Sequence, residues 1–239
     1  MLSKRLEEVS KLVDLNKVVY DVGSDHGLLP CFLVKEGISP KAYASDNKEG
    51  PLNKAKENIK RYHLEDKVIP VLCDGIDLIE DDVDIITICG MGYFTVEHIL
   101  GDKDLSKYSK IIVQVNKDVP LLRKYINDHH YKIIDERVVY DDFYYEIVVF
   151  TARESATYSD LEIEYGPILL KNKDELFIEY LNNRIKTLKK IYMSPNNHKT
   201  LQSIKEIEGI LGYNGWGRKI CEILMKILSK KLLIKKKIL

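Results

Sequence analysis

A glycine-rich turn that carries two acids is the segment of this chain with the clearest chemical potential. It runs Asp21-Val-Gly-Ser-Asp-His-Gly27, after an apolar β-like run and before a helix-like segment. The glycines let a ligand approach the backbone, and the following helix start offers unpaired N–H groups. A dinucleotide site favours G-x-G-x-x-G, but here Asp25 stands where a middle glycine is common. Two carboxylates would repel a pyrophosphate, so the turn favours S-adenosylmethionine, with an ordinary strand-to-helix turn as the simpler interpretation.

Four further β-like runs end in polar or glycine-rich residues. The sites are Asp46-Asn47, suited to ribose hydroxyls, Asp74-Gly75, suited to an adenine ring, Gly90-Met91-Gly92-Tyr93-Phe94, facing the sulfonium and the incoming base, and Gln114-Val115-Asn116 at the cleft mouth. Ligands of open α/β sheets lie beyond the carboxyl ends of the strands, so we expect these residues to converge. Taken singly, Asp46 and Asp74 could instead cap helices.

The elements that must position these residues alternate along the chain. β-like runs cover 17–22, 41–46, 67–73, 83–89, 109–115, 131–140 and 143–150, and helix-like segments cover 1–12, 51–62, 94–100 and 119–128. Such alternation predicts a parallel sheet covered on both faces. Only Asp141-Asp142 joins the last two runs, which must therefore form an antiparallel hairpin. The predicted fold is α/β: a Rossmann-like, seven-stranded class I methyltransferase sheet.

Beyond residue 155 the apolar period changes to about 3.6, which indicates helices. One stripe contains Phe177, Leu181, Ile185, Leu188 and Tyr192, and a second, after the break at 194–197, contains Leu201, Ile204, Ile207 and Leu211. We therefore expect a domain at 1–155 and a helical domain at 156–239, with a coiled-coil-like hairpin and a basic tail from about residue 216. The tail could contact RNA, pack on the hairpin or touch a membrane surface, the last being the least favoured.

The charges of the chain are distributed unevenly. Residues 1–150 hold 20 Lys and Arg against 27 Asp and Glu, which leaves 17 against 10 for the rest. A cationic C-terminal part fits a polyanion such as nucleic acid, although a solvated helical surface would look the same.

Other features of the composition narrow the class of protein. No run of eighteen apolar residues and no signal-peptide pattern occur, and the four cysteines lie far apart. These features predict a cytoplasmic protein with free thiols, with no metal site and no membrane contact.

Several of these motifs together resemble the bacterial tRNA (adenine-N1)-methyltransferases that modify position 22. The resemblance rests on Leu2-Ser-Lys-Arg-Leu6, Asp21 to Pro30, Gly50-Pro51, Asp74-Gly75, Gly90-Met91-Gly92 and Gln114-Val-Asn116. It implies S-adenosylmethionine as the methyl donor, tRNA as the partner, and a helical pair that helps to hold the tRNA. Two residues depart from the family pattern, namely Tyr93, where a third glycine is usual, and Val115, where a proline is usual.

The expected roles follow from these placements. Cofactor contacts are predicted for Asp21, Gly23, Ser24, His26, Gly27, Asp46, Asn47, Asp74, Gly75, Gly90 and Met91. Substrate contacts are predicted for Gly92, Tyr93, Gln114, Asn116, Lys186, Lys189 and Lys190. Asp25 and Asn116 are the candidate catalytic residues.

N1 of adenine has an in-plane lone pair, so methyl transfer depends on positioning and on exposing the Watson–Crick edge. Tyr93 or Phe94 is predicted to stack on the extruded base, although Phe94 alone is more simply interpreted as a core residue. Asp25 could accept the proton that the methylated adenine loses. We expect a monomer.

Three other functions compete with this one. They are a non-catalytic RNA-binding protein on a retained methyltransferase fold, a methyltransferase of small molecules or proteins, and a dinucleotide dehydrogenase. Retention of Asp21, Gly23, Asp46 and Asp74 argues against the first, and the cationic C-terminal part argues against the second.

Overall fold

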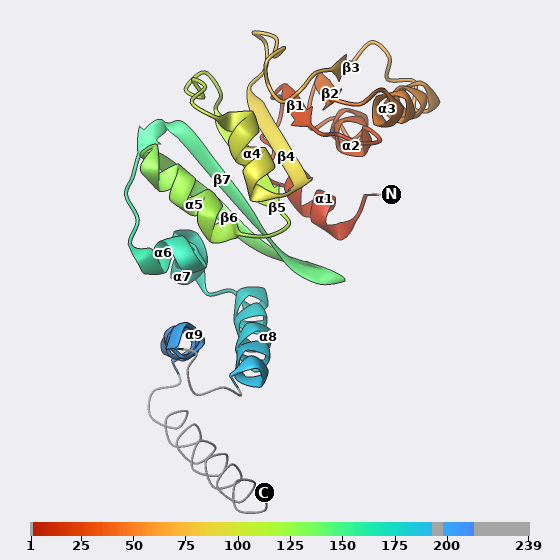
Figure 1. Cartoon of the computed structure of the whole chain (residues 1–239). Coiled ribbons are helices and arrows are strands. Elements are labelled where there is room, and N and C mark those ends of the chain that lie inside the picture. Colours follow the sequence, from red (N-terminus) through yellow and green to blue (C-terminus); the bar gives the residue numbers. More distant parts are fainter. Residues whose placement is uncertain (1, 193–197, 213–239) are drawn as a thin grey trace, which may run out of the picture. The chain divides into compact units, whose positions relative to one another are not determined.

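A single seven-stranded sheet organises the first part of the chain. The computed structural model describes residues 2–192 and 198–212. Its strands are β1 (Val19–Val22), β2 (Ala42–Asp46), β3 (Val68–Leu72), β4 (Ile85–Met91), β5 (Lys110–Val115), β6 (Tyr131–Asp141) and β7 (Phe143–Ser155). They lie in the order β3-β2-β1-β4-β5-β7-β6, with β1 to β5 parallel and β7 antiparallel to both of its neighbours. The seven predicted strands and the closing hairpin are confirmed (Figure 1).

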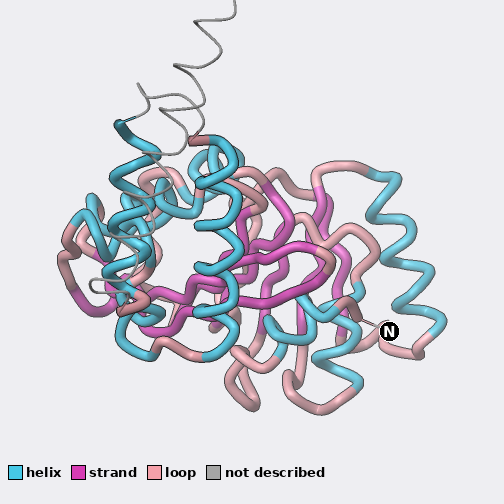
Figure 2. Tube along the Cα trace, turned by 90° about the horizontal axis from the view of Figure 1, so that it is seen from below, coloured by secondary structure: helices cyan, strands magenta, loops and turns pink. Residues whose placement is uncertain are grey.

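Helices cover both faces of the sheet because the strands are apolar on both sides. Along β1, Val19 packs in one core cluster and Tyr20 in the other, and Ile85 and Ile86 divide in the same way along β4. One face is covered by α1 (Lys4–Ser10), α2 (Leu28–Lys35) and α3 (Glu49–Arg61), and the other by α4 (Tyr93–Leu100) and α5 (Val119–Asp128). Figure 2 shows helices on both sides of the strands. Alternation of this kind is expected for a doubly covered parallel sheet.

The turn between β6 and β7 is tight, as expected from the two residues that join the two β-like runs of the sequence. Asp141 pairs with Phe143, and Asp142 turns the chain with φ of 59°. Asp tolerates this left-handed conformation better than most residues.

Two short helices that the sequence did not reveal follow the sheet. They are α6 (Asp160–Tyr165), which starts in a Ser159–Glu162 capping box, and α7 (Pro167–Asn172). Each is too short to show a helical apolar period, which explains why pattern reasoning missed them.

The chain divides into two compact units, Met1–Leu176 and Phe177–Leu239. The second unit contains most of α8 (Glu175–Ile191) and all of α9 (His198–Ile210). Phe177, Leu181 and Ile185 are buried along α8, and Ile204 and Ile207 along α9, as the two stripes predicted. Lys189 pairs with Glu208 across the two helices at 2.9 Å. The predicted break at 194–197 and the tail from 216 lie outside the described residues, and the coiled-coil character and the boundary at 155 stay predictions.

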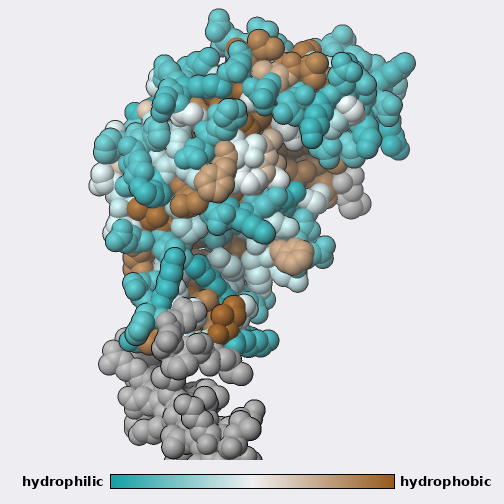
Figure 3. All heavy atoms as spheres, in the orientation of Figure 1, coloured by the Kyte–Doolittle hydropathy of each residue, from teal (hydrophilic) through white to brown (hydrophobic). Residues whose placement is uncertain are grey.

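The surface and the cysteines fit the composition. On the face seen in Figure 3, hydrophilic side chains surround scattered hydrophobic ones. Cys31 and Cys73 are buried and Cys89 is half-buried, all three as free thiols, whereas Cys221 lies outside the described residues. Within residues 2–192 and 198–212, no cluster of His, Cys, Asp or Glu could hold a metal ion, and no helix could span a membrane.

Candidate active site

The glycine turn after β1 is built from three residues with left-handed backbone. Gly23, Asp25 and Gly27 have φ of 65°, 51° and 64°. The Ser24 amide donates to the Ser45 carbonyl at 2.8 Å, and the Gly27 amide donates to the Ser24 carbonyl at 2.9 Å, which closes the turn before α2. The left-handed φ favours glycine at position 23, and a Cβ there would lie 2.0 Å from the Met91 Cε, so the flexible end of Met91 would have to move.

Asp21 supplies a buried carboxylate beneath this turn. Its side chain accepts a hydrogen bond from the Thr87 hydroxyl at 2.6 Å, and the residue is 5% exposed. Burial raises the pKa of Asp21 to about 6. No Lys, Arg or His pairs with it in the described part of the chain. A buried acid without a counter-ion is an attractive partner for a cationic ligand.

The end of β4 contains a bulge at Gly90. Cys89 lies opposite Gln114 and Met91 opposite Val115, so Gly90 is the extra residue, and its φ is 80°. The Gly90 amide donates to Gln114 Oε1 at 3.0 Å, and Asn116 Nδ2 donates to the Gly90 carbonyl at 2.7 Å. The two amide side chains therefore fix the backbone of the bulge.

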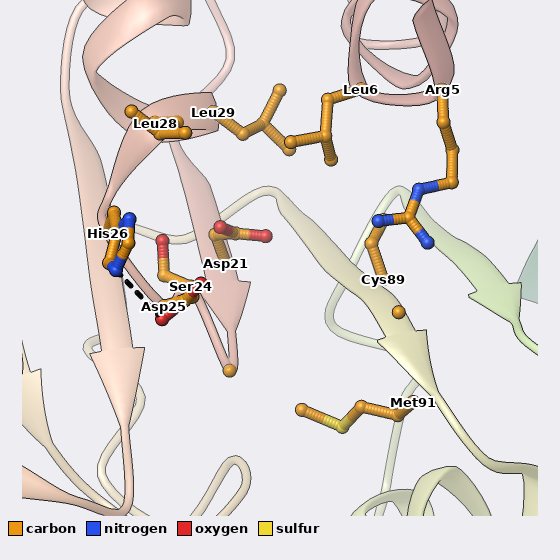
Figure 4. A pocket seen from close by; sticks show the side chains of 12 residues that line it. Arg5, Leu6, Asp21, Ser24, Asp25, His26, Leu28, Leu29, Cys89 and Met91 are labelled. Carbon is orange, nitrogen blue, oxygen red and sulfur yellow. Dashed lines mark ion pairs between the residues drawn. The ribbon is translucent and has the colours of Figure 1, made fainter. Parts of the chain in front are cut away.

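A cavity of about 260 Å³ lies between the β1 turn and the end of β4 (Figure 4). Its lining includes seven residues that the sequence analysis predicted for the site: Asp21, Gly23, Ser24, Asp25, His26, Gly90 and Met91. His26 Nε2 lies 3.5 Å from Asp25 Oδ1, marked by the dashed line in Figure 4. The Ser24 hydroxyl is buried and has no hydrogen-bond partner among the described residues.

The lining also contains residues that the sequence analysis did not assign to the site. They are Arg5, Leu6, Leu28, Leu29 and Cys89. Arg5 and Leu6 belong to α1, whose Leu2-Ser-Lys-Arg-Leu6 segment is part of the family resemblance. That segment was the available signal for a role in the site. Nothing in its spacing indicated which side chain would face a ligand.

The ends of β2 and β3 lie beside this cavity without lining it. Asp46 Oδ1 accepts from the Lys48 amide at 2.9 Å, which closes a turn before α3; the N-cap of α3 is Lys48 and no side chain caps the helix, so the capping interpretation of Asp46 is wrong. Asn47 Nδ2 donates to Asp74 Oδ1 at 3.3 Å, which brings these two predicted residues together. Gly75 is buried with φ of 74° against Ile99, where a Cβ would approach to 3.4 Å. The cofactor roles of Asp46, Asn47, Asp74, Gly75 and Gly27 stay predictions.

The two aromatic residues after Gly92 occupy opposite environments. Tyr93 is 7% exposed and its hydroxyl donates to Glu97 Oε1 at 2.6 Å, whereas Phe94 is 70% exposed. The interpretation of Phe94 as a core residue is therefore wrong. Val115 is also buried. Neither Tyr93 nor Val115 lines the cavity, so the two departures from the family pattern are core substitutions that leave the cavity lining intact.

Gln114 and Asn116 differ in how free they are to contact a substrate. Gln114 is completely buried, and its amide nitrogen donates to the Val115 carbonyl at 2.8 Å and to Asn116 Oδ1 at 3.4 Å. Its oxygen accepts from Arg5 and from Gly90. Asn116 is exposed. Gln114 thus has a supporting position, and the substrate contacts of Gln114 and Asn116 stay predictions.

The predicted basic residues of α8 are exposed. Lys189 pairs with Glu208, whereas Lys186 and Lys190 form no ion pair with any described residue.

The cavity fits S-adenosylmethionine by its chemistry. Asp21 offers an unpaired carboxylate to a cationic ligand, Ser24 offers a buried hydroxyl that lacks a partner, and Gly23 leaves no side chain over the turn. Such a ligand would bring an electrophilic methyl group on a sulfonium. No side chain of the cavity would need to act as the methyl carrier.

Comparison with known proteins gives the same result. A Bacillus subtilis tRNA (adenine(22)-N(1))-methyltransferase is 29% identical over 219 residues, which cover 86% of this chain and 92% of that protein. A Streptococcus pneumoniae protein solved in complex with S-adenosyl-L-methionine is 30% identical with a TM-score of 0.82, over 88% of this chain and 100% of that one. M. capricolum TrmK, solved with S-adenosyl-homocysteine, is 35% identical with a TM-score of 0.75, over 89% and 97% of the two chains.

The family model that matches this chain is described as tRNA (adenine(22)-N(1))-methyltransferase, and it spans residues 19–212, from the first strand of the sheet to the end of the described helices. With the acidic glycine turn, the buried Asp21 and the bulge at Gly90 all in that span, the chain belongs to the TrmK family of S-adenosylmethionine-dependent tRNA methyltransferases.

Proposed function

We propose that this enzyme methylates N1 of adenine 22 in tRNA, and that the cavity between Gly23 and Gly90 receives the methyl donor. The observation that carries the proposal is the buried, unpaired carboxylate of Asp21 beside the glycine turn, in a cavity that also contains the partnerless Ser24 hydroxyl. A sulfonium cofactor is a cation, which an acid of this kind attracts.

Different residues around the cavity are proposed to contact different parts of the cofactor. Asp21, Ser24, Gly90 and Met91 line the cavity, and Gly23 and Gly27 shape the turn before α2. Asp46 and Asp74, at the neighbouring strand ends, are proposed to contact the ribose and the adenine.

The target adenine needs little chemical activation. Its N1 lone pair attacks the methyl group directly, so the protein contributes position and exclusion of water. The exposed Phe94 ring is better placed than the buried Tyr93 ring to stack on an extruded base. Asn116 is bonded through Nδ2 to the carbonyl of Gly90, which lines the cavity, and its second N–H is proposed to contact the base edge.

Asp25 is the candidate for accepting a proton from the product. Methylated adenine is a cation until N6 loses a proton, and a nearby carboxylate stabilises that cation. The Asp25 side chain is 71% exposed at the rim of the cavity, where it can exchange a proton with water.

The tRNA body is proposed to bind the basic face of α8. Lys186 and Lys190 are exposed and keep their charges unpaired among the described residues, so they are available to phosphates. Lys189 shares its charge with Glu208. A monomer in the cytoplasm is part of the same proposal, and sedimentation checks the oligomeric state.

The test uses methyl-labelled S-adenosylmethionine with an unmodified tRNA and with the same tRNA carrying guanine at position 22. We expect label in 1-methyladenosine with the first tRNA and none with the second. Asp21→Ala is expected to remove both cofactor binding and transfer. Label in another nucleoside, or label that persists in the guanine-22 tRNA, would contradict the proposal. Cofactor binding without transfer to any tRNA would instead favour the non-catalytic RNA-binding alternative.

A further inference from the structure

Arg5 is the one residue of α1 whose charged group faces the cavity. Helix α1 begins after Ser3, whose hydroxyl accepts from the Leu6 amide, and the Arg5 amide donates to Asp141 Oδ2 at 3.3 Å. These bonds fix the start of the helix. Figure 4 shows the Arg5 side chain reaching from α1 toward the end of β4, on the side of the cavity opposite Asp21.

The guanidinium contacts only neutral groups. Its Nη1 donates to Gln114 Oε1 at 2.8 Å and to Asn116 Oδ1 at 3.4 Å, and its carbon lies 5.1 Å from the centre of the Tyr145 ring. Arg5 forms no ion pair with any acid in the described part of the chain. Arg123 and Arg137, by contrast, do pair with acids. A full positive charge therefore faces the cavity with donors to spare.

The surroundings hold this charge in place. The guanidinium lies close to the Gly90 backbone, since a Cβ there would be in ordinary contact with both terminal nitrogens of Arg5 at 3.7 Å. The completely buried Gln114 orients Nη1 of Arg5 by accepting its hydrogen bond. Cys89 lies between the two charges: burial raises the pKa of its thiol, Asp21 raises it further, and Arg5 lowers it. The cavity is thus lined by an acid on one side and a base on the other.

We propose that Arg5 binds the carboxylate of the amino-acid end of S-adenosylmethionine, while Asp21 attracts the positively charged groups of the same ligand. An amino acid is a zwitterion, and an unpaired guanidinium across a cavity from an unpaired carboxylate is complementary to it. Arginine suits a carboxylate because its planar donors can bind both oxygens. The inference rests on the proposed function and adds a residue that selects for the intact amino-acid end.

The experiment compares S-adenosylmethionine with its decarboxylated form, which differs only in lacking the carboxylate. Binding of each is measured by calorimetry to the wild-type chain, to Arg5→Met, to Arg5→Lys and to a control, Lys4→Met. Lys4 is an exposed neighbour on the same helix that does not line the cavity, so its loss removes a charge without touching the site. Because the readout is binding, it does not depend on transfer to tRNA.

We expect wild type to prefer S-adenosylmethionine about tenfold or more, as a hydrogen-bonded charge pair predicts. In Arg5→Met that preference should fall below about threefold, through weaker binding of S-adenosylmethionine with the decarboxylated form little changed. Arg5→Lys should keep part of the preference, and Lys4→Met all of it.

Three results would overturn the inference. If wild type does not prefer the carboxylate, Arg5 has another role, whatever the variants do. If Arg5→Met weakens both ligands equally, the side chain only supports Gln114 and Asn116. If it leaves both ligands unchanged and raises the KM for tRNA, Arg5 faces the RNA. Normal methylation of tRNA by wild type in any of these cases would leave the proposed function standing.

Discussion

At the level of single residues, the ionised side chain of Asp21 favours binding of a cationic ligand but lowers the stability of the ligand-free protein. Its folded-state pKa of about 6 lies above the ordinary value of 3.8 because the carboxyl group is buried. The folded state therefore holds the proton more tightly than the unfolded chain does. The resulting stabilisation is fully present below about pH 4 and is lost as the pH rises through 6. Above pH 6 the ionised group costs the empty protein about 3 kcal/mol.

Asp21→Asn should remove this cost. We expect the free energy of unfolding of the ligand-free protein at pH 8 to rise by about 1–3 kcal/mol, because the Asn oxygen can still accept from Thr87. At pH 4 the gain should vanish, since wild-type Asp21 is then protonated. S-adenosylmethionine affinity should fall in the variant, whereas in wild type it should weaken only below pH 6. Urea unfolding at the two pH values checks this, and an equal gain at both would show that the charge is not responsible.

Gly23 and Gly37 form a matched pair for testing how closely the turn fits. Both have left-handed backbone, with φ of 65° and 70°, but a Cβ on Gly37 would meet nothing within 4 Å, whereas one on Gly23 would overlap Met91. Each alanine variant should lose about 1–2 kcal/mol of stability from backbone strain. Only Gly23→Ala should also lose cofactor affinity, by tenfold or more, because the Met91 side chain must move into the cavity. Calorimetry with S-adenosyl-homocysteine checks this, and similar losses in both variants would contradict it.

The sequence predicted the acids and glycines of the site better than its aromatic and basic residues. Asp21 and Gly23 were found because a turn with those residue types has few other uses. Phe94 was wrongly interpreted as a core residue, although the spacing of the buried Tyr93, Val96 and Leu100 on α4 is that of a helical stripe, which leaves Phe94 outside it. Arg5 carried no comparable signal, since its site is formed only when α1 packs on the ends of β4 and β5.

Among the elements, the sheet is joined to α6 and α7 by a buried charge cluster. Arg123 of α5 is completely buried and pairs with Glu136 of β6 at 2.7 Å and with Glu146 of β7. The second oxygen of Glu136 accepts from the Ile168 amide at 2.8 Å, at the start of α7. A carboxylate at a helix start is favourable, and it also binds the short helix to the sheet. Arg123, Glu136 and Glu146 lie far apart in the sequence, and charged residues are usually exposed. Nothing in the sequence therefore indicated that these three would form a buried cluster.

Among the lysines of α8, we expect Lys186 and Lys190 to affect tRNA binding and Lys189 to affect stability. Lys186→Glu with Lys190→Glu should weaken tRNA binding by tenfold or more in low salt and reduce the slope of affinity against salt concentration. Thermal stability should change little, because neither side chain pairs with a described residue. Lys189→Glu should lower stability by up to about 1 kcal/mol through repulsion of Glu208, and Glu208→Lys in the same chain should restore it.

Filter binding at several salt concentrations, with thermal unfolding in parallel, tests this division. If the double reversal leaves tRNA affinity unchanged, the RNA-binding surface lies elsewhere.

For the molecule as a whole, the seven-stranded sheet and its closing hairpin were predictable, whereas the end of the first unit is still to be tested. Five strand-to-helix repeats and a two-residue link admit few arrangements, so the topology followed from the sequence. The limit at 155 was drawn where the period of the apolar residues changes. The first compact unit extends to Leu176, and within it α6 and α7 contribute the buried Tyr165 and Leu169 beside the buried Arg123, so the boundary at 155 is still to be tested.

Two shortened chains distinguish these boundaries. A chain of residues 1–176 keeps the sheet, the whole cavity lining and the bonds that α7 donates to Glu136. It should unfold cooperatively and gain about 2.7 kcal/mol from S-adenosyl-homocysteine at one hundred times its Kd, as the full chain does.

A chain of residues 1–155 loses those bonds and exposes the cluster, and breaking the partners of a buried charge typically costs about 3–5 kcal/mol. It should therefore unfold at lower temperature or fail to fold, while both shortened chains lose the basic face of α8 and bind tRNA at least tenfold more weakly. Thermal unfolding of the two chains, with and without ligand, distinguishes the boundaries. Equal stability would place the boundary at 155, because α6 and α7 would then add no stability to the sheet and its charge cluster.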